Sequence, residues 1–182
     1  MSAISVAGDT SGSITLQAPA VAGSTVLTLP AQTGTVMVNG PAFSAYANAD
    51  LSVTSNVVTK VNINTENFDT ASCFDTTLYR FTPTVAGYYQ VNGCVSGSAS
   101  ATFTQINAYI YKNGALIFRS QIGATLTAGG QTKTTIATLV YMNGSTDYLE
   151  LYGMVTGTGT IIFNYISSAD TSTFSASMVR SA

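Results

Sequence analysis

Short runs in which apolar and polar residues alternate, separated by turn sequences, fill most of this chain and restrict its fold class. The runs are rich in Thr, Val, Ile and Tyr, and no long apolar stripe recurs at helical spacing. Asn113-Gly114 joins two runs with only two residues, the signature of a type I′ hairpin. The predicted strands are 42–47, 57–64, 78–82, 88–95, 103–112, 115–122, 132–142, 148–155, 160–166 and 173–179. About ten short strands in about 140 residues predict an all-β sandwich or jelly roll.

Residues 1–40 differ from the rest and form a predicted N-terminal arm. The β-like runs of this arm are 13–16, 25–29 and 35–38. Pro19 and Pro30 interrupt them, and proline cannot donate a ladder hydrogen bond. About forty residues are too few to bury a core alone, so the arm must pack on a neighbour, on its own copies or on a larger body. The side chains expected to anchor it are Ile14, Leu16, Val26, Leu27 and Leu29. The turn at Asn39-Gly40-Pro41 then begins a second domain, residues 41–182.

Charged residues are scarce: they make up 8% of the chain, against about 25% in ordinary soluble domains, and the net charge is −2. A near-neutral surface favours association. The six Lys and Arg residues are scattered singly, which argues against nucleic-acid binding. No apolar stretch reaches the roughly 18 residues of a membrane span. Met1 to Gly12 lacks the basic and apolar regions of a signal peptide. We therefore expect a protein made in a cytoplasm that acts within an assembly.

Several tyrosines occupy strand positions that point away from the predicted core. In the run 106–111, Ile106 and Ile110 share one face, whereas Tyr109 and Tyr111 share the other. Subunit interfaces favour tyrosine because its large apolar ring carries a polar tip. The predicted interface residues are Tyr89, Tyr109, Tyr111, Tyr148 and Tyr152. The alternative is that loops cover these rings or that they lie singly on the surface.

The residues needed for most enzyme chemistry are missing. Histidine is absent, so Ser-His-Asp and Cys-His arrangements are excluded. Two cysteines without histidine cannot supply the four soft ligands of a zinc site. Cys73 and Cys94 are expected to remain thiols in a protein without a signal peptide, and a Cys73–Cys94 bridge is the less favoured alternative. We therefore expect no enzyme activity and no cofactor.

One loop-rich stretch holds three acids, Glu66, Asp69 and Asp75. Turn capping by their side chains is the favoured interpretation. A calcium site built with loop carbonyls is a weaker alternative, and an acid–base pair for glycoside cleavage is the weakest.

From Phe43 to Val179 the chain resembles the globular C1q-like domain of the C1q and tumour-necrosis-factor superfamily. The segments that carry the resemblance are Ala42-Phe43-Ser44-Ala45, Phe74-Asp75, Arg80-Phe81-Thr82-Pro83, Gly87-Tyr88-Tyr89, Lys112-Asn113-Gly114 and Phe174-Ser175-Ala176. Two departures are Ala176, where the family has glycine, and residues 143–147, where it usually has Gly-Asp. The resemblance implies a ten-strand jelly roll and a tight homotrimer.

The arm, in contrast, resembles segments of fibre and minor structural proteins of tailed bacteriophages, on Ser13 to Pro19 and Leu27 to Val36. This resemblance implies a virion protein exposed on the particle exterior. The favoured function is a trimeric capsid decoration or cement protein, similar to a head fibre, whose arm binds the major capsid protein or another virion protein. The alternative is a tail-fibre or spike tip that binds a host-surface glycan or protein. Nucleic acid and membrane insertion are not expected.

Overall fold

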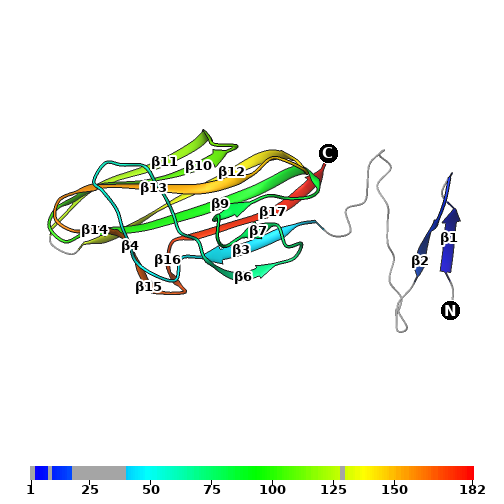
Figure 1. Cartoon of the computed structure of the whole chain (residues 1–182), viewed down its shortest axis with the longest axis horizontal. Helices are drawn as coiled ribbons and strands as arrows, with labels where there is room; N and C mark the ends of the chain where they lie inside the picture. Colours follow the sequence, from blue (N-terminus) through cyan, green and yellow to red (C-terminus); the bar gives the residue numbers. More distant parts are fainter. Residues whose placement is uncertain (1–2, 8–9, 18–39, 128–129) are drawn as a thin grey trace. The chain divides into compact units, whose positions relative to one another are not determined.

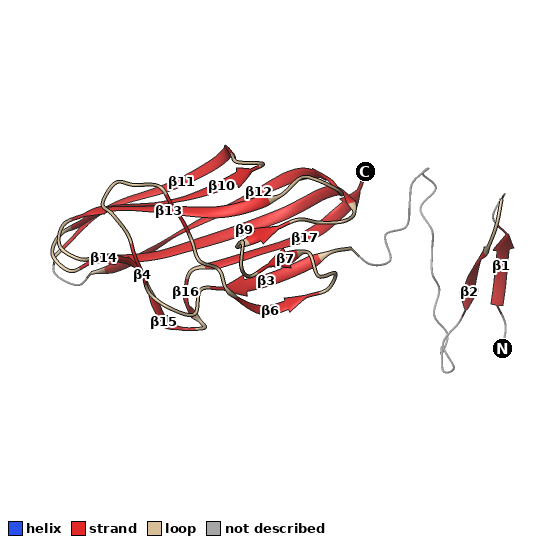
Figure 2. Cartoon of the chain, viewed as in Figure 1, coloured by secondary structure: helices blue, strands red, loops and turns tan. Residues whose placement is uncertain are grey.

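The computed structural model describes residues 3–7, 10–17, 40–127 and 130–182. These residues belong to two separate units, an N-terminal hairpin and a larger β-sheet body, and each is described by itself. Every regular element among the described residues is a strand, and none is a helix (Figure 2). The predicted all-β fold class is confirmed.

The N-terminal hairpin consists of β1 (Ala3–Ala7) and β2 (Ser13–Gln17), which pair in antiparallel fashion. The register pairs apolar with apolar residues, Ile4 with Leu16 and Val6 with Ile14. β2 overlaps the predicted run 13–16, whereas β1 was not predicted. The predicted runs 25–29 and 35–38 lie outside the described residues.

The larger body contains two main β-sheets (Figure 1). In spatial order the six-stranded sheet consists of β11 (Ala115–Leu126), β10 (Phe103–Lys112), β13 (Leu149–Gly157), β8 (Arg80–Phe81) and β7 (Phe74–Asp75), with β5 (Thr59–Lys60) also paired to β13. The seven-stranded sheet consists of β4 (Leu51–Ser52), β14 (Ile161–Phe163), β9 (Ala86–Ala99), β17 (Thr173–Ser181), β3 (Ala42–Tyr46) and β6 (Thr65–Asp69), with β12 (Gln131–Asn143) also paired to β9. A further small hairpin consists of β15 (Tyr165–Ser167) and β16 (Asp170–Thr171).

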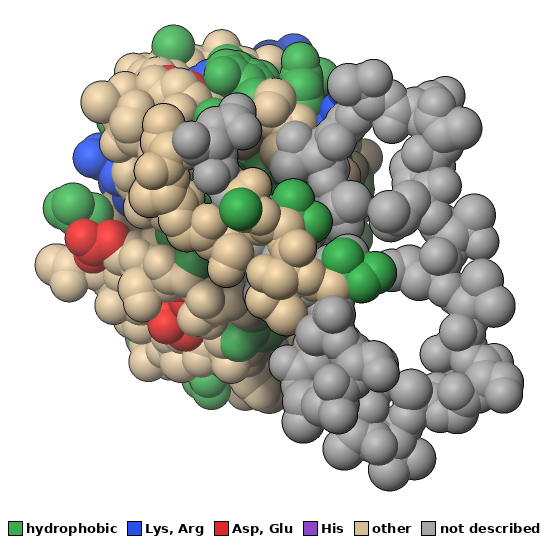
Figure 3. Space-filling view, turned by 90° about the vertical axis from the view of Figure 1, so that its right-hand side faces the viewer, with side chains coloured by type: hydrophobic (Ala, Val, Ile, Leu, Met, Phe, Trp, Pro, Cys, Tyr) green, Lys and Arg blue, Asp and Glu red, His purple; other side chains and the backbone are tan. Residues whose placement is uncertain are grey.

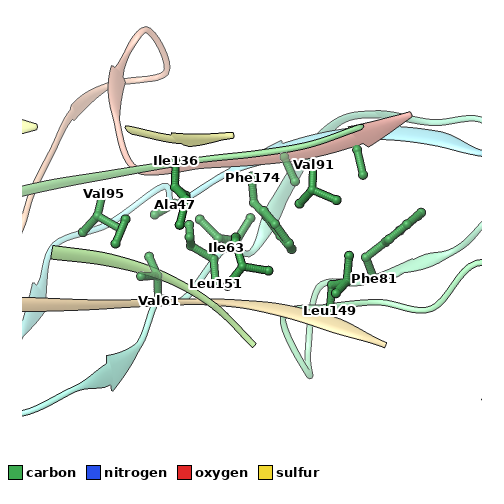
Figure 4. Packing of buried hydrophobic residues seen from close by; sticks show 14 of the residues in the cluster. Ala47, Val61, Ile63, Phe81, Val91, Val95, Ile136, Leu149, Leu151 and Phe174 are labelled. Carbon is green, nitrogen blue, oxygen red and sulfur yellow. The ribbon is translucent and has the colours of Figure 1, made fainter. Parts of the chain in front are cut away.

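The core lies between these two sheets. Figure 4 shows Val91, Ile136 and Phe174 of the seven-stranded sheet pointing toward Leu149 and Leu151 of the six-stranded sheet. The alternation of the sequence produces this arrangement, because successive residues of a strand point to opposite faces.

Close packing of the sheets explains one glycine of β13. A Cβ atom built on Gly153 would lie 2.7 Å from Cζ of Phe163 and 2.7 Å from Cγ1 of Val95, both in the opposite sheet. Any larger residue at position 153 would therefore push the sheets apart.

The predicted hairpin at Asn113-Gly114 is confirmed. β10 and β11 pair up to Lys112 and Ala115, and the two turn residues have φ angles of 53° and 77°. A type I′ turn requires positive φ at both central residues, which Asn and Gly adopt most easily.

The long strands agree with the sequence prediction, whereas several of the short ones do not. The run 57–64 was predicted as one strand, but only Thr59–Lys60 forms a strand, β5. Strands β4, β6, β7 and β16 were missed. Three of these four contain two residues, which is too short for a periodic pattern to identify.

Candidate assembly and binding surfaces

Tyr89, predicted at a subunit interface, lies in the core of the single chain. Its side chain is 0% exposed, its hydroxyl donates to the carbonyl of Val85 at 2.8 Å, and its ring packs edge-on against Phe81. Burial raises the pKa of Tyr89 to about 12. The interface prediction is wrong for this residue, because β9 directs Tyr89 inward and its neighbour Tyr88 outward.

Tyr109 is also buried within the single chain, although it points away from the core as predicted. It is 5% exposed, accepts a hydrogen bond from Nδ2 of Asn107 at 2.9 Å, and donates to the sulfur of Met154 at 3.7 Å. Its immediate neighbours therefore cover the ring, and the prediction that Tyr109 contacts another subunit is wrong.

The other three predicted tyrosines, Tyr111, Tyr148 and Tyr152, are half-buried. We call them the tyrosine face. The rings of Tyr111 and Tyr152 lie 4.4 Å apart between centroids, at diagonal positions of the paired strands β10 and β13. The guanidinium of Arg80 lies 3.6 Å above the centre of the Tyr148 ring. Enough of each ring remains exposed for contact with another molecule, so a place at a subunit interface stays a prediction for these three.

A buried acid lies among these rings. The side chain of Glu150 is 4% exposed, and its Oε1 accepts hydrogen bonds from Lys60 at 2.6 Å and from Nη2 of Arg80 at 2.9 Å. Tyr152 donates to Oε2 at 3.4 Å. Burial alone would raise the pKa of Glu150, but the hydrogen bonds and charges of Lys60 and Arg80 outweigh it and hold the pKa below its usual value. The carboxylate thus links β5, β8 and β13.

An apolar ridge lies along β11, an edge strand of the six-stranded sheet. β11 pairs with β10 on one side only, and Phe118 and Ile122 lie opposite the core residues Ile110 and Ile106. Phe118 is nevertheless 49% exposed and Ile122 40% exposed. Long apolar edge strands are sites of pairing or packing with other chains.

An apolar hollow of about 590 Å3 lies on the outward face of the seven-stranded sheet. Its lining residues are Tyr88, Leu139, Tyr141, Val179, Arg180, Ser181 and Ala182. The rings of Tyr88 and Tyr141 lie 5.5 Å apart on paired strands β9 and β12. Leu139 is 55% exposed, although leucine is usually buried. The ridge and the hollow lie on different sheets of the same body, and sequence reasoning found neither.

Glu66, Asp69 and Asp75, the three acids considered for a calcium site, do not form one cluster. Asp69 accepts the backbone N–H groups of Ala71 at 3.0 Å and Phe74 at 2.7 Å. Asp75 accepts those of Thr77 and Leu78, and these bonds lower its pKa. Glu66 is exposed on β6. Within residues 3–7, 10–17, 40–127 and 130–182, no group of three His, Cys, Asp or Glu is placed to hold a metal ion.

The two cysteines are free thiols. Cys73 is buried, whereas Cys94 is half-buried on β9, where burial raises the pKa of its thiol. Of the predicted anchoring residues, Ile14 and Leu16 lie in β2. The other three, Val26, Leu27 and Leu29, lie outside the described residues. No described segment forms a helix of the length and hydropathy that would cross a membrane.

The face shown in Figure 3 agrees with the composition: it carries groups of apolar side chains and few charged ones. An exposed surface of this kind gains stability mainly by apolar contact, because it offers few ion pairs to a partner.

Comparison with solved structures identifies the fold. The chain is similar to the globular domain of zebrafish complement 1qA protein, with 12% identity and a TM-score of 0.56 over 78% of this chain and 99% of that chain. It is also similar to Eiger TNF from S. frugiperda, with 11% identity and a TM-score of 0.57 over 79% and 93%. Murine APRIL gives 9% identity and a TM-score of 0.56 over 78% and 100%.

No family model matches the sequence, and no curated protein matches it. The similarity to known proteins is therefore a similarity of fold. The predicted C1q/TNF-like jelly roll is confirmed by these structures.

Proposed function

We propose that this protein is a non-enzymatic structural protein of a virus particle, a trimeric decoration or cement protein on the capsid exterior. The observation that carries the proposal is the presence of two exposed apolar surfaces, the ridge and the hollow, on one charge-poor body. Burial of apolar area is the main favourable contribution to association. Exposure of the ridge and the hollow to water therefore favours association over the monomer.

The ridge of one copy is proposed to pack into the hollow of the next. Phe118 and Ile122 belong to β11, whereas the hollow belongs to β9, β12 and β17, so the contact joins two different surfaces. Such head-to-tail contacts form a closed ring when the rotation closes. We expect the ring to contain three copies, because the resemblance of the sequence to the C1q and tumour-necrosis-factor superfamily implies a homotrimer.

Residues 1–40 are proposed to anchor the trimer to the major capsid protein or another virion protein. The described part of this arm is a two-stranded hairpin, in which Ile4 and Val6 are 66% and 58% exposed. Two-stranded hairpins are marginally stable in water by themselves. A partner surface that covers these side chains would stabilise the hairpin and attach the body, residues 41–182.

Particle binding tests the role directly. Virions that lack the protein are mixed with the full chain or with residues 41–182 alone, and bound protein is measured after sedimentation of the particles. The full chain should bind and the arm-less body should remain in solution. Equal binding of both proteins would refute anchoring by the arm, and failure of the full chain to bind would refute the decoration role.

A second candidate function is adhesion as a tail-fibre or spike tip. It is favoured by the tyrosine face, which lies on the six-stranded sheet, whereas the hollow lies on the seven-stranded one. In this case residues 41–182 alone should bind host cells and compete with infection. The same truncated protein thus separates the two functions.

A further inference from the structure

We propose that the tyrosine face binds an anionic saccharide, a sugar ring that carries a carboxylate or a phosphate group. The inference goes beyond capsid assembly and does not depend on it, because the residues concerned lie on the six-stranded sheet, away from the hollow.

The first argument is the character of the three rings. Tyr111, Tyr148 and Tyr152 are half-buried, so part of each ring and its polar tip can contact a ligand, although Arg80 covers one face of the Tyr148 ring. In the described part of the chain the hydroxyls of Tyr111 and Tyr148 have no hydrogen-bond partner, whereas that of Tyr152 donates to Glu150. A sugar has an apolar C–H face and a rim of hydroxyl groups, which matches aromatic rings with free hydroxyls at their edges. An aliphatic partner would leave these polar groups unpaired.

The second argument concerns the charged groups that a bound ligand would contact. The side chains of Lys60 and Arg80 are 27% and 30% exposed, whereas the Glu150 carboxylate between them is 4% exposed. A ligand therefore reaches the two cations and not the anion.

Both cations also retain unused donors. Arg80 uses Nε and Nη2 for Glu150, which leaves Nη1, and Lys60 uses one of its three ammonium hydrogens. Arginine and lysine donors bind carboxylate and phosphate oxygens strongly.

The neighbouring acids leave the donors of the two cations free. Asp75 on β7 lies opposite Arg80 in the register, is exposed and keeps its negative charge, so together with Glu150 it balances the charges of Lys60 and Arg80. The preference for an anion therefore rests on the unused donors and not on net charge. Asp147 is paired with Lys112 at 2.8 Å. The charged groups with donors left for a ligand at this face are therefore Lys60 and Arg80.

The test is a nuclear magnetic resonance titration of the full chain with three sugars: glucuronate, glucose 6-phosphate and glucose. Glucuronate and glucose 6-phosphate should shift the amide resonances of β10 and β13 saturably, and glucose should bind about tenfold more weakly, as expected for loss of one charge-assisted hydrogen bond. Acetate serves as the simple anion and should bind no better than glucose.

Two variants and a control assign the site. Lys60→Gln should reduce the preference for glucuronate over glucose, because one of the two cationic donors is lost while Arg80 still pairs with Glu150. Tyr111→Ala should weaken both sugars. Tyr46→Ala, a half-buried tyrosine on β3 of the other sheet, should change neither.

Several outcomes would overturn the proposal. They are absence of binding by all three sugars, equal binding of glucose and glucuronate, acetate binding as tight as glucuronate, or equal effects of Tyr46→Ala and Tyr111→Ala. Sedimentation of the same variants should be unchanged, which separates failure of this site from failure of assembly.

Discussion

The Glu150 carboxylate holds two very short strands against β13. β5 and β8 each pair with β13 through two residues, which is too little backbone ladder to fix them alone. Lys60 on β5 and Arg80 on β8 both donate to the same oxygen of Glu150. Removal of the carboxylate leaves two cations close together without an anion, so a single side chain controls how three strands are joined.

Acid should weaken the fold through this residue. Because the pKa of Glu150 is lower in the folded chain than its ordinary value of 4.5, its contribution is complete above pH 4.5 and is lost as pH falls through the folded pKa. Glu150→Gln should lower the free energy of unfolding by about 1–3 kcal/mol at neutral pH. Denaturant unfolding should show that the difference in the free energy of unfolding between wild type and variant becomes smaller below about pH 4. A difference in the free energy of unfolding that stays constant with pH would contradict the role assigned to the Glu150 carboxylate.

Ile110 tests the core assignment at the same scale. Its side chain is 0% exposed in the middle of β10, so Ile110→Ala should cost about 2–5 kcal/mol, as other buried large-to-small changes do. Ile166→Ala is the matched control, because Ile166 is 59% exposed and its truncation should cost about 0.5 kcal/mol or less. Thermal unfolding measures both, and similar losses in the two variants would mean that the faces of β10 are exchanged.

Among the elements, β9 to β13 were predictable because each is long enough for apolar alternation to be counted. Two-residue strands such as β7 have no period, and their pairing is fixed by neighbours distant in sequence.

The same dependence on residues distant in sequence explains why the candidate sites could be predicted only in part. The burial of Tyr89 and Tyr109 depends on which residues pack around them, and the exposure of Phe118 depends on the tertiary structure around β11. Alternation places Phe118 on the core side, and only the tertiary structure leaves it half in water.

The edge strand β11 gives an element-scale prediction. Phe118→Ser should leave the body folded, because this side chain is 49% exposed, but should shift the protein from trimer to monomer. Ile117→Ser, on the same strand at 38% exposure and outside the proposed core-side ridge, is the control and should leave the trimer intact. Analytical ultracentrifugation at several concentrations measures both. A trimer that tolerates Phe118→Ser as well as Ile117→Ser would remove the ridge from the interface.

At the scale of the whole molecule, charge is too sparse to drive assembly. Six basic and eight acidic residues are present in 182, and four ion pairs in the described chain, such as Lys112 with Asp147, already join residues of the same copy. The exposed side chains of the ridge and the hollow are mainly apolar or aromatic, and Arg180 is the one charged side chain among the described residues that line the hollow. The proposed contact between copies therefore depends on removal of apolar area from water.

The scarcity of charge and the exposed apolar area together predict how the proposed trimer responds to salt and to urea. Salt screens exposed charges, with a Debye length of about 3 Å at 1 M, so an assembly held by ion pairs dissociates as salt rises. The trimer proposed here should persist in 1 M or so sodium chloride and become more stable in sulfate, which strengthens apolar burial. Urea at concentrations below the unfolding transition should instead release monomers, because urea solvates apolar groups. Sedimentation velocity at low salt, high salt, sulfate and urea measures each case, with circular dichroism to verify that the chain stays folded. Dissociation by sodium chloride, with the fold intact, would show that charges hold the copies together and would reject the contact between ridge and hollow.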